Sequence, residues 1–295
     1  MSPTSRAWRA VALAVTALVA LLGCAGEPAR PAPAGPGLDP ALHDLLPADI
    51  RRSGVLAIAT DAGYPPASLY APDGRTVIGF EPDLAVAVGK LLGVRVRFVV
   101  TDFVHALEEM RAGRADVVMS AMTDTLGRER HADFVNYFRA GTSVVVQRGN
   151  PHGVIGIEDL CGQVVAVERG TVQVDLLRRS QERCAEDRIR IRTRRTNADA
   201  LVELRTGRAA AVLNDYPPAT YLATSPQTQA YYQLASTVQY EPGLYGVAVP
   251  KEETRLRDAL RAAFERLLST GHYRRILRSW DVADGAVDHI TVNAG

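Results

Sequence analysis

The sequence lacks the short motifs that identify common enzyme classes. It contains no G-x-S-x-G, no H-E-x-x-H, no P-loop and no G-x-G-x-x-G. Its six histidines are scattered and form no spacing suited to a metal ion, so we expect neither a metal site nor a cofactor. The 34 basic side chains are nearly balanced by 33 acidic ones, which gives no positive field of the kind that nucleic acid requires. These absences favour a binding protein over an enzyme or a nucleic-acid partner.

Long apolar runs are absent beyond the N-terminal segment. Residues 10–22 form a thirteen-residue apolar run that follows Arg6 and Arg9 and leads into Leu-Leu-Gly-Cys at 21–24. The run is too short to span a bilayer comfortably and is typical of a lipoprotein signal peptide over 1–23, with lipidation at Cys24. The alternative is an ordinary signal peptide with an incidental cysteine. Because two or more acyl chains anchor stably, we expect an extracytoplasmic protein held on the outer face of the cell membrane through this lipid alone.

Proline is concentrated just after that segment. Six of the seventeen prolines fall within residues 25–47, with alanine and glycine between them. Such a composition is extended and builds no core, so we interpret residues 24–48 as a tether. The remaining length from Asp49 is sufficient for two domains.

Cysteine is scarce, with three residues in the whole chain. If Cys24 carries lipid, Cys161 and Cys184 remain, and an even pair in an exported chain is normally a disulfide. Two buried free thiols are the alternative.

A sixteen-residue segment is present twice. Residues 106–121 read ALEEMRAGRADVVMSA and residues 200–215 read ALVELRTGRAAAVLND, with eight positions identical. A spacing of 94 residues is too long for a solenoid and indicates two lobes of related design. Each copy predicts a helix stopped by glycine and followed by an apolar strand with small polar residues at its end. Ligands of open α/β sheets bind at such strand ends, so the repeat predicts a cleft lined from two lobes.

Two charged side chains follow these strand ends. Arg128 comes shortly after Ser120 and Thr123, a combination suited to a carboxylate, although it could equally be an exposed arginine in a turn. Asp215 ends the matching strand and could hold an ammonium, although a turn or N-cap aspartate is the commoner reading. The repeat places the two on facing lobes. Together they describe a receptor for the zwitterion of an α-amino acid.

The chain from about residue 53 to 280 resembles the polar amino acid-binding proteins of ATP-driven importers, which are bacterial solute-binding proteins of family 3. The resemblance rests on six ordered motifs: Ala59–Pro66, Ile78–Leu84, Ser120–Phe134, Val165–Thr171, Asn214–Pro217 and Tyr245–Lys251. It implies the type II periplasmic-binding-protein fold, with two α/β lobes joined by two hinge crossings. Lobe 1 would comprise residues 49–145 and 245–290, and lobe 2 residues 148–240.

The resemblance also assigns the ligand contacts. Arg128 and Thr123 correspond to residues that hold the ligand carboxylate, whereas Ser120 and Asp215 correspond to residues near its ammonium. Tyr64 and Phe103 match aromatic residues that enclose the ligand stem, and Gly170, Thr171 and Val172 match a loop that closes on the carboxylate. Without the family, ordinary core packing is the commoner role for the two aromatic residues. The full predicted set is Asp61, Tyr64, Phe103, Ser120, Met122, Thr123, Arg128, Glu168, Gly170, Thr171, Val172 and Asp215.

The sequence departs from the family pattern at three places, of which the first should be harmless and the other two leave the identity of the ligand open. Leu126-Gly127 stands where the family usually has Pro-Glu, and Ala67 where it usually has phenylalanine. Glu168 is an acid where relatives are commonly uncharged or basic. Because Arg128 and Asp215 are used on the zwitterion, Asp61 and Glu168 are additional acids that predict a polar, preferably cationic, ligand side chain.

The sequence therefore predicts a monomeric receptor that passes a free amino acid to the permease subunits of an ABC importer. Two alternatives stay open. One is an enzyme resembling cyclohexadienyl or arogenate dehydratases, with Glu168 as the acid. The other is a sensory lipoprotein that binds without transport.

Overall fold

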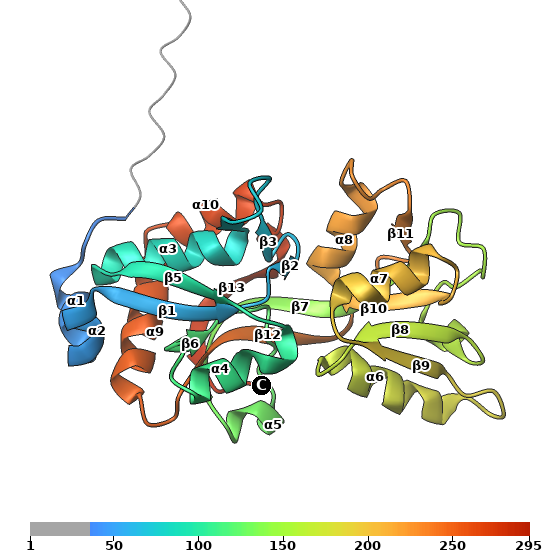
Figure 1. Cartoon of the computed structure of the whole chain (residues 1–295), viewed down its shortest axis with the longest axis horizontal. Helices are drawn as coiled ribbons and strands as arrows, with labels where there is room; N and C mark the ends of the chain where they lie inside the picture. The colour runs from blue at the N-terminus through green and yellow to red at the C-terminus, as the bar shows by residue number, and fades with distance from the viewer. Residues whose placement is uncertain (1–35) are drawn as a thin grey trace, which may run out of the picture. The chain divides into compact units, whose positions relative to one another are not determined.

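The computed structural model describes residues 36–295, which form two α/β lobes joined by two long antiparallel strands (Figure 1). The predicted two-lobed α/β fold is confirmed. We use "lobe 1" for the part built around β1 and α3, and "lobe 2" for the part built around β8 and α6. Lobe 1 contains α1 (Pro40–Leu45), α2 (Ala48–Ser53), β1 (Val55–Thr60), β2 (Gly63–Tyr64), β3 (Ser68–Tyr70), β4 (Val77–Ile78), α3 (Phe80–Leu92), β5 (Arg95–Val100), α4 (Ala106–Arg111), β6 (Val117–Val118), α5 (Leu126–Glu129), α9 (Thr254–Ser269), α10 (His272–Ser279) and β13 (Ala286–Val292). Lobe 2 contains β8 (Val164–Glu168), α6 (Val172–Ser180), β9 (Arg190–Arg194), α7 (Asn197–Arg205), β10 (Ala211–Asp215), α8 (Tyr216–Thr224) and β11 (Tyr232–Leu234).

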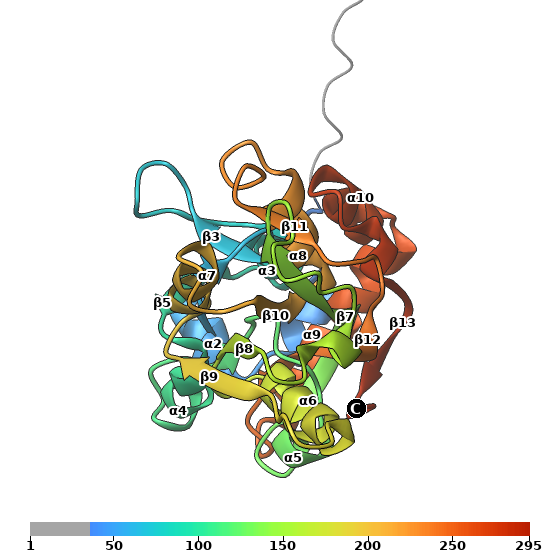
Figure 2. The same cartoon turned by 90° about the vertical axis from the view of Figure 1, so that its right-hand side faces the viewer.

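The strands β7 (Asp133–Gln147) and β12 (Tyr240–Val249) connect the lobes and pair with each other antiparallel. The main path of the sheet runs β5-β1-β6-β12-β7-β10-β8-β9. In lobe 1, β1 lies parallel to β5 and β6, and in lobe 2, β8 lies parallel to β9 and β10. Seen from lobe 2, α7 and α8 lie on one side of its strands and α6 on the other (Figure 2). Each lobe is thus a parallel sheet with helices on its faces, completed by one antiparallel connecting strand.

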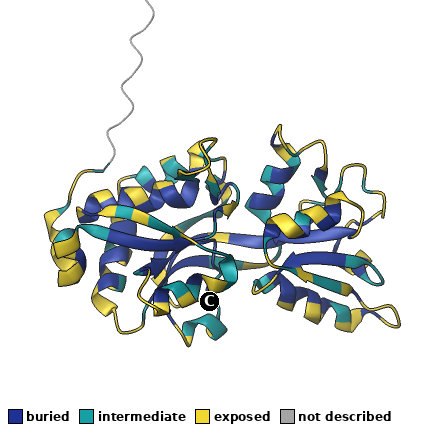
Figure 3. Ribbon diagram, in the orientation of Figure 1, coloured by how far each residue is buried: buried dark blue, intermediate teal, exposed yellow. Residues whose placement is uncertain are grey.

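Amphipathic helices build the core of lobe 1. In α3, Leu84, Val88 and Leu92 are buried on one stripe, and the helix ends at Gly93 in the left-handed conformation (φ +67°). This φ favours glycine because it has no Cβ to clash with the backbone. The helix α9 presents a similar apolar stripe to the same core. The central strands β1, β6, β7, β8 and β10 are accordingly buried, whereas the edge strands β5 and β9 are half-buried or exposed and the outer faces of the helices stay exposed (Figure 3).

The core of lobe 2 contains the predicted disulfide. Cys161 and Cys184 are bonded, with their Cα atoms 5.5 Å apart. Cys184 is buried among Leu160, Leu177 and other apolar side chains. The disulfide therefore joins the two ends of the segment that carries β8 and α6 and holds them at the core of lobe 2.

The folded region begins earlier than predicted. The helix α1 starts at Pro40, inside the range 24–48 interpreted as a tether, and the Asp39 carboxylate accepts the amides of Ala41 and Leu42 as an N-cap. Leu42 and Leu46 pack into the core of lobe 1. Proline is tolerated in the first turn of a helix. A high proline content therefore did not exclude a helix in this segment. The predicted signal peptide and Cys24 lie outside the described residues. No helix among residues 36–295 combines the length and apolar character needed to cross a bilayer.

The strand β7 passes from one core to the other. Tyr137 and Phe138 are buried in the core of lobe 1, whereas Val144 and Val146 are buried in that of lobe 2. The crossing from one core to the other therefore lies between these two pairs. The exact lobe boundaries given above remain predictions.

Candidate functional site

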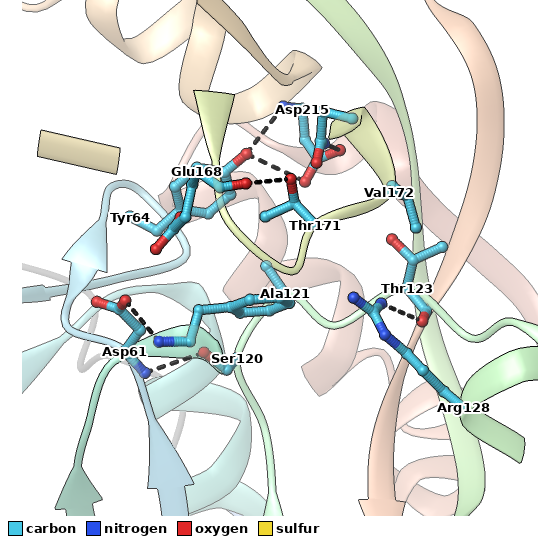
Figure 4. A pocket seen from close by; sticks show the side chains of 12 residues that line it. Asp61, Tyr64, Ser120, Ala121, Thr123, Arg128, Glu168, Thr171, Val172 and Asp215 are labelled. Carbon is cyan, nitrogen blue, oxygen red and sulfur yellow. Dashed lines mark hydrogen bonds between the residues drawn. The ribbon is translucent and has the colours of Figure 1, made fainter. Parts of the chain in front are cut away.

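One pocket is lined by both lobes (Figure 4). Ten of the twelve residues predicted as ligand contacts line it. The complete lining is Asp61, Tyr64, Phe103, Ser120, Ala121, Thr123 and Arg128 from lobe 1, with Glu168, Thr171, Val172, Gln173 and Asp215 from lobe 2. The structure thus brings the predicted residues together, while their contact with a ligand stays a prediction.

Parallel strands position most of these side chains. Asp61 follows β1, Ser120 follows β6, Glu168 ends β8 and Asp215 ends β10. The carboxyl ends of parallel strands in one sheet lie at the same edge. Because the two lobes present these edges to one pocket, groups that lie far apart in the sequence converge there.

Both carboxylate oxygens of Asp215 accept side-chain hydrogen bonds. Its Oδ1 accepts from Gln173 Nε2 at 2.7 Å, and its Oδ2 accepts from the Tyr64 hydroxyl at 3.1 Å. The Asp215 amide in turn donates to the Tyr64 oxygen at 2.9 Å. Burial raises the pKa of Asp215 to about 6, although Tyr64, Arg128 and Gln173 oppose the shift. Asp215 therefore remains mainly ionised at neutral pH.

Arg128 spans the opposite side of the pocket. Its Nη1 donates to the Thr123 carbonyl at 2.6 Å, its Nη2 donates to the Gly170 carbonyl of lobe 2 at 3.0 Å, and its guanidinium carbon lies 5.4 Å from the Phe103 ring centroid. Burial lowers the pKa of Arg128 to about 10, so the group stays cationic at neutral pH. A guanidinium has five N–H donors, and these two bonds leave further donors for an anion.

Asp61 and Glu168 form an acidic corner. The two Asp61 oxygens accept the amides of Gly63, at 2.7 Å, and of Phe103, at 3.1 Å, and burial raises its pKa. Glu168 is only 8% exposed, and its Oε1 is buried with no hydrogen-bond partner among the described residues. Burial, followed by the Asp61 charge, raises the pKa of Glu168 to about 8. Among residues 36–295, no cationic side chain forms an ion pair with Glu168.

Two predicted residues do not line the pocket. The Met122 side chain is 2% exposed and packs in the apolar core around β6, so its prediction as a ligand contact is not supported by side-chain position. Gly170 contributes its carbonyl to Arg128 and has φ +83°. A Cβ there would lie 3.2 Å from the Val104 side chain of lobe 1, so glycine permits the close approach of this loop.

Sequence reasoning missed Ala121 and Gln173. Gln173 lies one residue beyond the predicted Gly170–Val172 loop, and its bond to Asp215 depends on a helix start that the sequence places only approximately. Ala121 has φ +46°, and nothing about an alanine signals a left-handed backbone. Among residues 36–295, no group of His, Cys, Asp and Glu is arranged to hold a metal ion.

The two lobes are in direct contact across the pocket. Besides the Tyr64–Asp215 and Arg128–Gly170 bonds, Arg195 of lobe 2 lies 3.5 Å from the Asp102 carboxylate of lobe 1. Both partners of this ion pair are partly exposed, so it contributes little to stability. The two Tyr64–Asp215 hydrogen bonds are partly buried, whereas the Arg128–Gly170 bond is exposed.

Similar proteins have this fold and bind amino acids. The arginine-binding protein ArgT of Corynebacterium glutamicum is 30% identical over 260 residues, which cover 86% of this chain and 83% of ArgT. An ancestral arginine-binding protein bound to arginine is 29% identical, with a TM-score of 0.71 and coverage of 77% of this chain and 98% of that one. The ancestral amino acid-binding protein AncCDT-1, a precursor of cyclohexadienyl dehydratase, is 31% identical, with a TM-score of 0.70 over 79% of this chain and 97% of that one.

A family model covers most of the described residues. The model of the bacterial extracellular solute-binding proteins, family 3, matches residues 56–283. This range includes all of lobe 2, most of lobe 1, both connecting strands and every residue of the pocket. The chain therefore belongs to family 3 of the bacterial extracellular solute-binding proteins.

Proposed function

We propose that the chain captures a cationic amino acid, with arginine, lysine or ornithine ahead of glutamine, in the pocket between its lobes. The observation that carries this proposal is the buried Glu168 carboxylate, whose Oε1 has no partner among the described residues. An unpaired charge is costly to bury, and burial accordingly raises the pKa of Glu168 to about 8. A guanidinium or ammonium on the ligand would stabilise the ionised carboxylate and pair with it.

The remaining charges suit the zwitterion that all amino acids share. Arg128 would bind the ligand carboxylate together with the first amides of α6, which have no carbonyl partner within the helix. Asp215 would accept the ligand ammonium while Tyr64 and Gln173 hold its orientation. Tyr64 and Phe103 line the space between these ends and the acidic corner, where they can pack on the ligand stem. The names of ArgT and of the arginine-bound ancestral protein support a cationic ligand.

Calorimetry with arginine, lysine, ornithine, glutamine and glutamate tests this assignment. We expect the cationic ligands to bind most tightly and Glu168→Gln to weaken them selectively. The loss of a charged hydrogen-bonded pair in such a pocket is on the order of 2–5 kcal/mol. Glutamate as the tightest ligand, or cationic ligands that bind Glu168→Gln as well as the natural protein, would contradict the proposal.

The cellular role belongs to the same proposal. The receptor would be held by lipid on Cys24 outside the cell membrane and would deliver its ligand to ABC permease subunits as a monomer. Mass spectrometry of the membrane-bound protein should find a diacylglyceryl group on Cys24. Uptake of labelled arginine should require both this protein and a permease. An unmodified Cys24 would refute the anchor, and unchanged uptake after deletion would favour a sensory role.

One observation favours an enzymatic alternative. Glu168 has a pKa raised to about 8, which is suited to a general acid at neutral pH, and AncCDT-1 is described as a precursor of a dehydratase. Incubation with prephenate and arogenate distinguishes the two functions. Turnover that disappears in Glu168→Gln would establish the enzyme.

A further inference from the structure

The motif at residues 78–84 contains a buried acid that the proposed function does not use. Glu81 lies in the first turn of α3, in lobe 1, and is 1% exposed. Its Oε1 accepts the amide of Ala121 at 2.6 Å and also accepts the hydroxyl of Tyr137. Its Oε2 is buried with no partner among the described residues. A fully buried acid is rare unless it is paired or hydrogen-bonded.

The amide that Glu81 holds belongs to a strained residue. Ala121 has φ +46° and is 6% exposed. For a residue other than glycine, this left-handed conformation costs about 1–2 kcal/mol, and it persists only where the surroundings impose it. A hydrogen bond from a backbone amide to a carboxylate is charge-assisted and stronger than a neutral one. Glu81 thus supplies the contact that compensates for the strain.

The strained turn forms one wall of the pocket. Ser120 precedes it, and its Oγ accepts the Asp61 amide at 2.9 Å. Met122 follows and is anchored in the core, where its carbonyl accepts the Gly246 amide at 3.0 Å. The next residue, Thr123, provides the carbonyl that holds Arg128. A left-handed residue reverses the local direction of the chain, so the conformation of Ala121 sets how the segment 120–123 faces the ligand.

We propose that Glu81 is a positioning residue, whose carboxylate holds the left-handed turn at Ala121 and thereby orients Ser120, Thr123 and Arg128 toward the ligand. The proposal rests on the proposed function of the pocket as an amino acid site. Glu81 does not line the pocket and acts through the backbone. Tyr137, which is fully buried, fixes the carboxylate from the side of β7.

The binding test uses Glu81→Leu, Glu81→Gln, Ala121→Gly and the double variant Glu81→Leu/Ala121→Gly. Leucine removes the acceptor, so we expect affinity for the tightest amino acid to fall at least about tenfold. Glutamine retains an acceptor oxygen and should stay within about fivefold of the natural protein. Glycine adopts positive φ without steric cost, so the double variant should recover most of the affinity that Glu81→Leu loses. Ala121→Gly alone gives the reference affinity against which the double variant is compared.

A ligand-independent measurement separates this proposal from the proposed function. Burial raises the pKa of Glu81 to about 7, so the nuclear magnetic resonance spectrum of the natural protein is recorded well above that pH. There the Ala121 amide proton should lie downfield because it donates to an ionised carboxylate. It should move upfield in Glu81→Gln, whose acceptor is neutral.

An unmoved Ala121 resonance overturns the proposal even if Glu81→Leu fails to fold. A folded Glu81→Leu with unchanged affinity, or a double variant that recovers nothing, overturns it as well. If no amino acid binds the natural protein, the proposed function fails while the Ala121 resonance still tests the role of Glu81.

Discussion

Glu168 and Asp215 end neighbouring parallel strands of lobe 2, yet their carboxylates have different surroundings. Both Asp215 oxygens accept hydrogen bonds from Gln173 and Tyr64, so its charge is stabilised before a ligand arrives. The Glu168 Oε1 has no such donor among the described residues. The two acids therefore suit different tasks. In the proposed function, Asp215 would receive the ammonium that every amino acid carries, whereas Glu168 would discriminate by the charge of the ligand side chain.

Arginine affinity should depend on pH through Glu168. Its pKa of about 8 means that the carboxyl is largely protonated at pH 7, while a bound guanidinium would favour the ionised form and lower the pKa. Binding then releases a proton, so affinity should rise with pH up to about 8, by at most about tenfold per pH unit, and level off above. Calorimetry of arginine at pH 6.5, 7.5 and 8.5 measures this trend.

Free glutamine as the ligand provides the control for this pH series, because it has the same zwitterionic groups as arginine but an uncharged side chain. Glu168→Gln should remove the additional pH dependence of arginine and leave that of glutamine unchanged. Equal slopes for the two ligands in the natural protein would exclude Glu168 from the side-chain subsite.

Removal of Arg128 should abolish amino acid binding. Arg128→Ala deletes the guanidinium that would bind the ligand carboxylate, and it also deletes the interlobe bond to Gly170. We expect a loss of about 2–5 kcal/mol in binding free energy with a cooperative fold retained. Arg130→Ala is the matched control, since Arg130 is exposed and does not line the pocket. An Arg128→Ala protein that binds within about threefold of the natural one would place the carboxylate elsewhere.

At the scale of elements, the duplicated segment folds twice into the same unit. The first copy forms α4 and β6 with Gly113 at φ +70°, and the second forms α7 and β10 with Gly207 at φ +71°. β6 lies between a parallel strand and β12, and β10 lies between a parallel strand and β7. The repeat was therefore sufficient to predict the two lobes and the convergence of Ser120 and Asp215.

Other elements depend on pairings that a single sequence does not display. β13 was not predicted, because its register against β7 joins residues about 150 positions apart, such as Ala286 and Phe138. The pairing of β7 with β12 extends from Val249 and Asp133 to Tyr240 and Thr142, and the sequence of neither strand identifies its partner. The left-handed Ala121 and the buried orientation of Met122 likewise follow from tertiary contacts that local patterns do not encode.

The disulfide should stabilise lobe 2 without shaping the pocket. Its loop spans a sequence separation of 23 residues, and the chain-entropy model gives about 3 kcal/mol for a loop of such length. Denaturant unfolding of Cys161→Ser/Cys184→Ser should show this loss, while ligand affinity stays nearly constant because neither cysteine lines the pocket. Natural protein unfolded in reductant is the control. An affinity loss as large as the stability loss would show that the bond also positions the site.

For the whole molecule, the bonds between the lobes are few and lie at the pocket. Tyr64 of lobe 1 both donates to and accepts from Asp215 of lobe 2, and Arg128 donates to Gly170. The residues that would hold the ligand are thus the residues that hold the lobes together. In the proposed function, ligand binding and lobe closure by hinge bending would use the same side chains.

Tyr64→Phe should therefore weaken both closure and binding. The substitution keeps the ring but removes a hydrogen bond to a charged group, which is worth about 1.5–3 kcal/mol. We expect small-angle scattering to show a more extended ligand-free protein, and calorimetry to show affinity reduced about tenfold or more. Tyr70→Phe, at an exposed position of lobe 1, should change neither quantity. Unaltered scattering of Tyr64→Phe would show that this hydroxyl does not control closure.

The raised pKa of Glu168 also determines what a membrane partner can detect. At pH 7, a mostly neutral carboxyl would exchange its proton for the guanidinium of arginine, while the ligand zwitterion adds no net charge. The loaded and unloaded receptors then carry nearly the same total charge and present almost the same long-range field. Isoelectric focusing would hardly separate them. A permease that distinguishes the two forms would have to recognise the relative positions of the lobes, because the two forms differ little in electrostatic attraction.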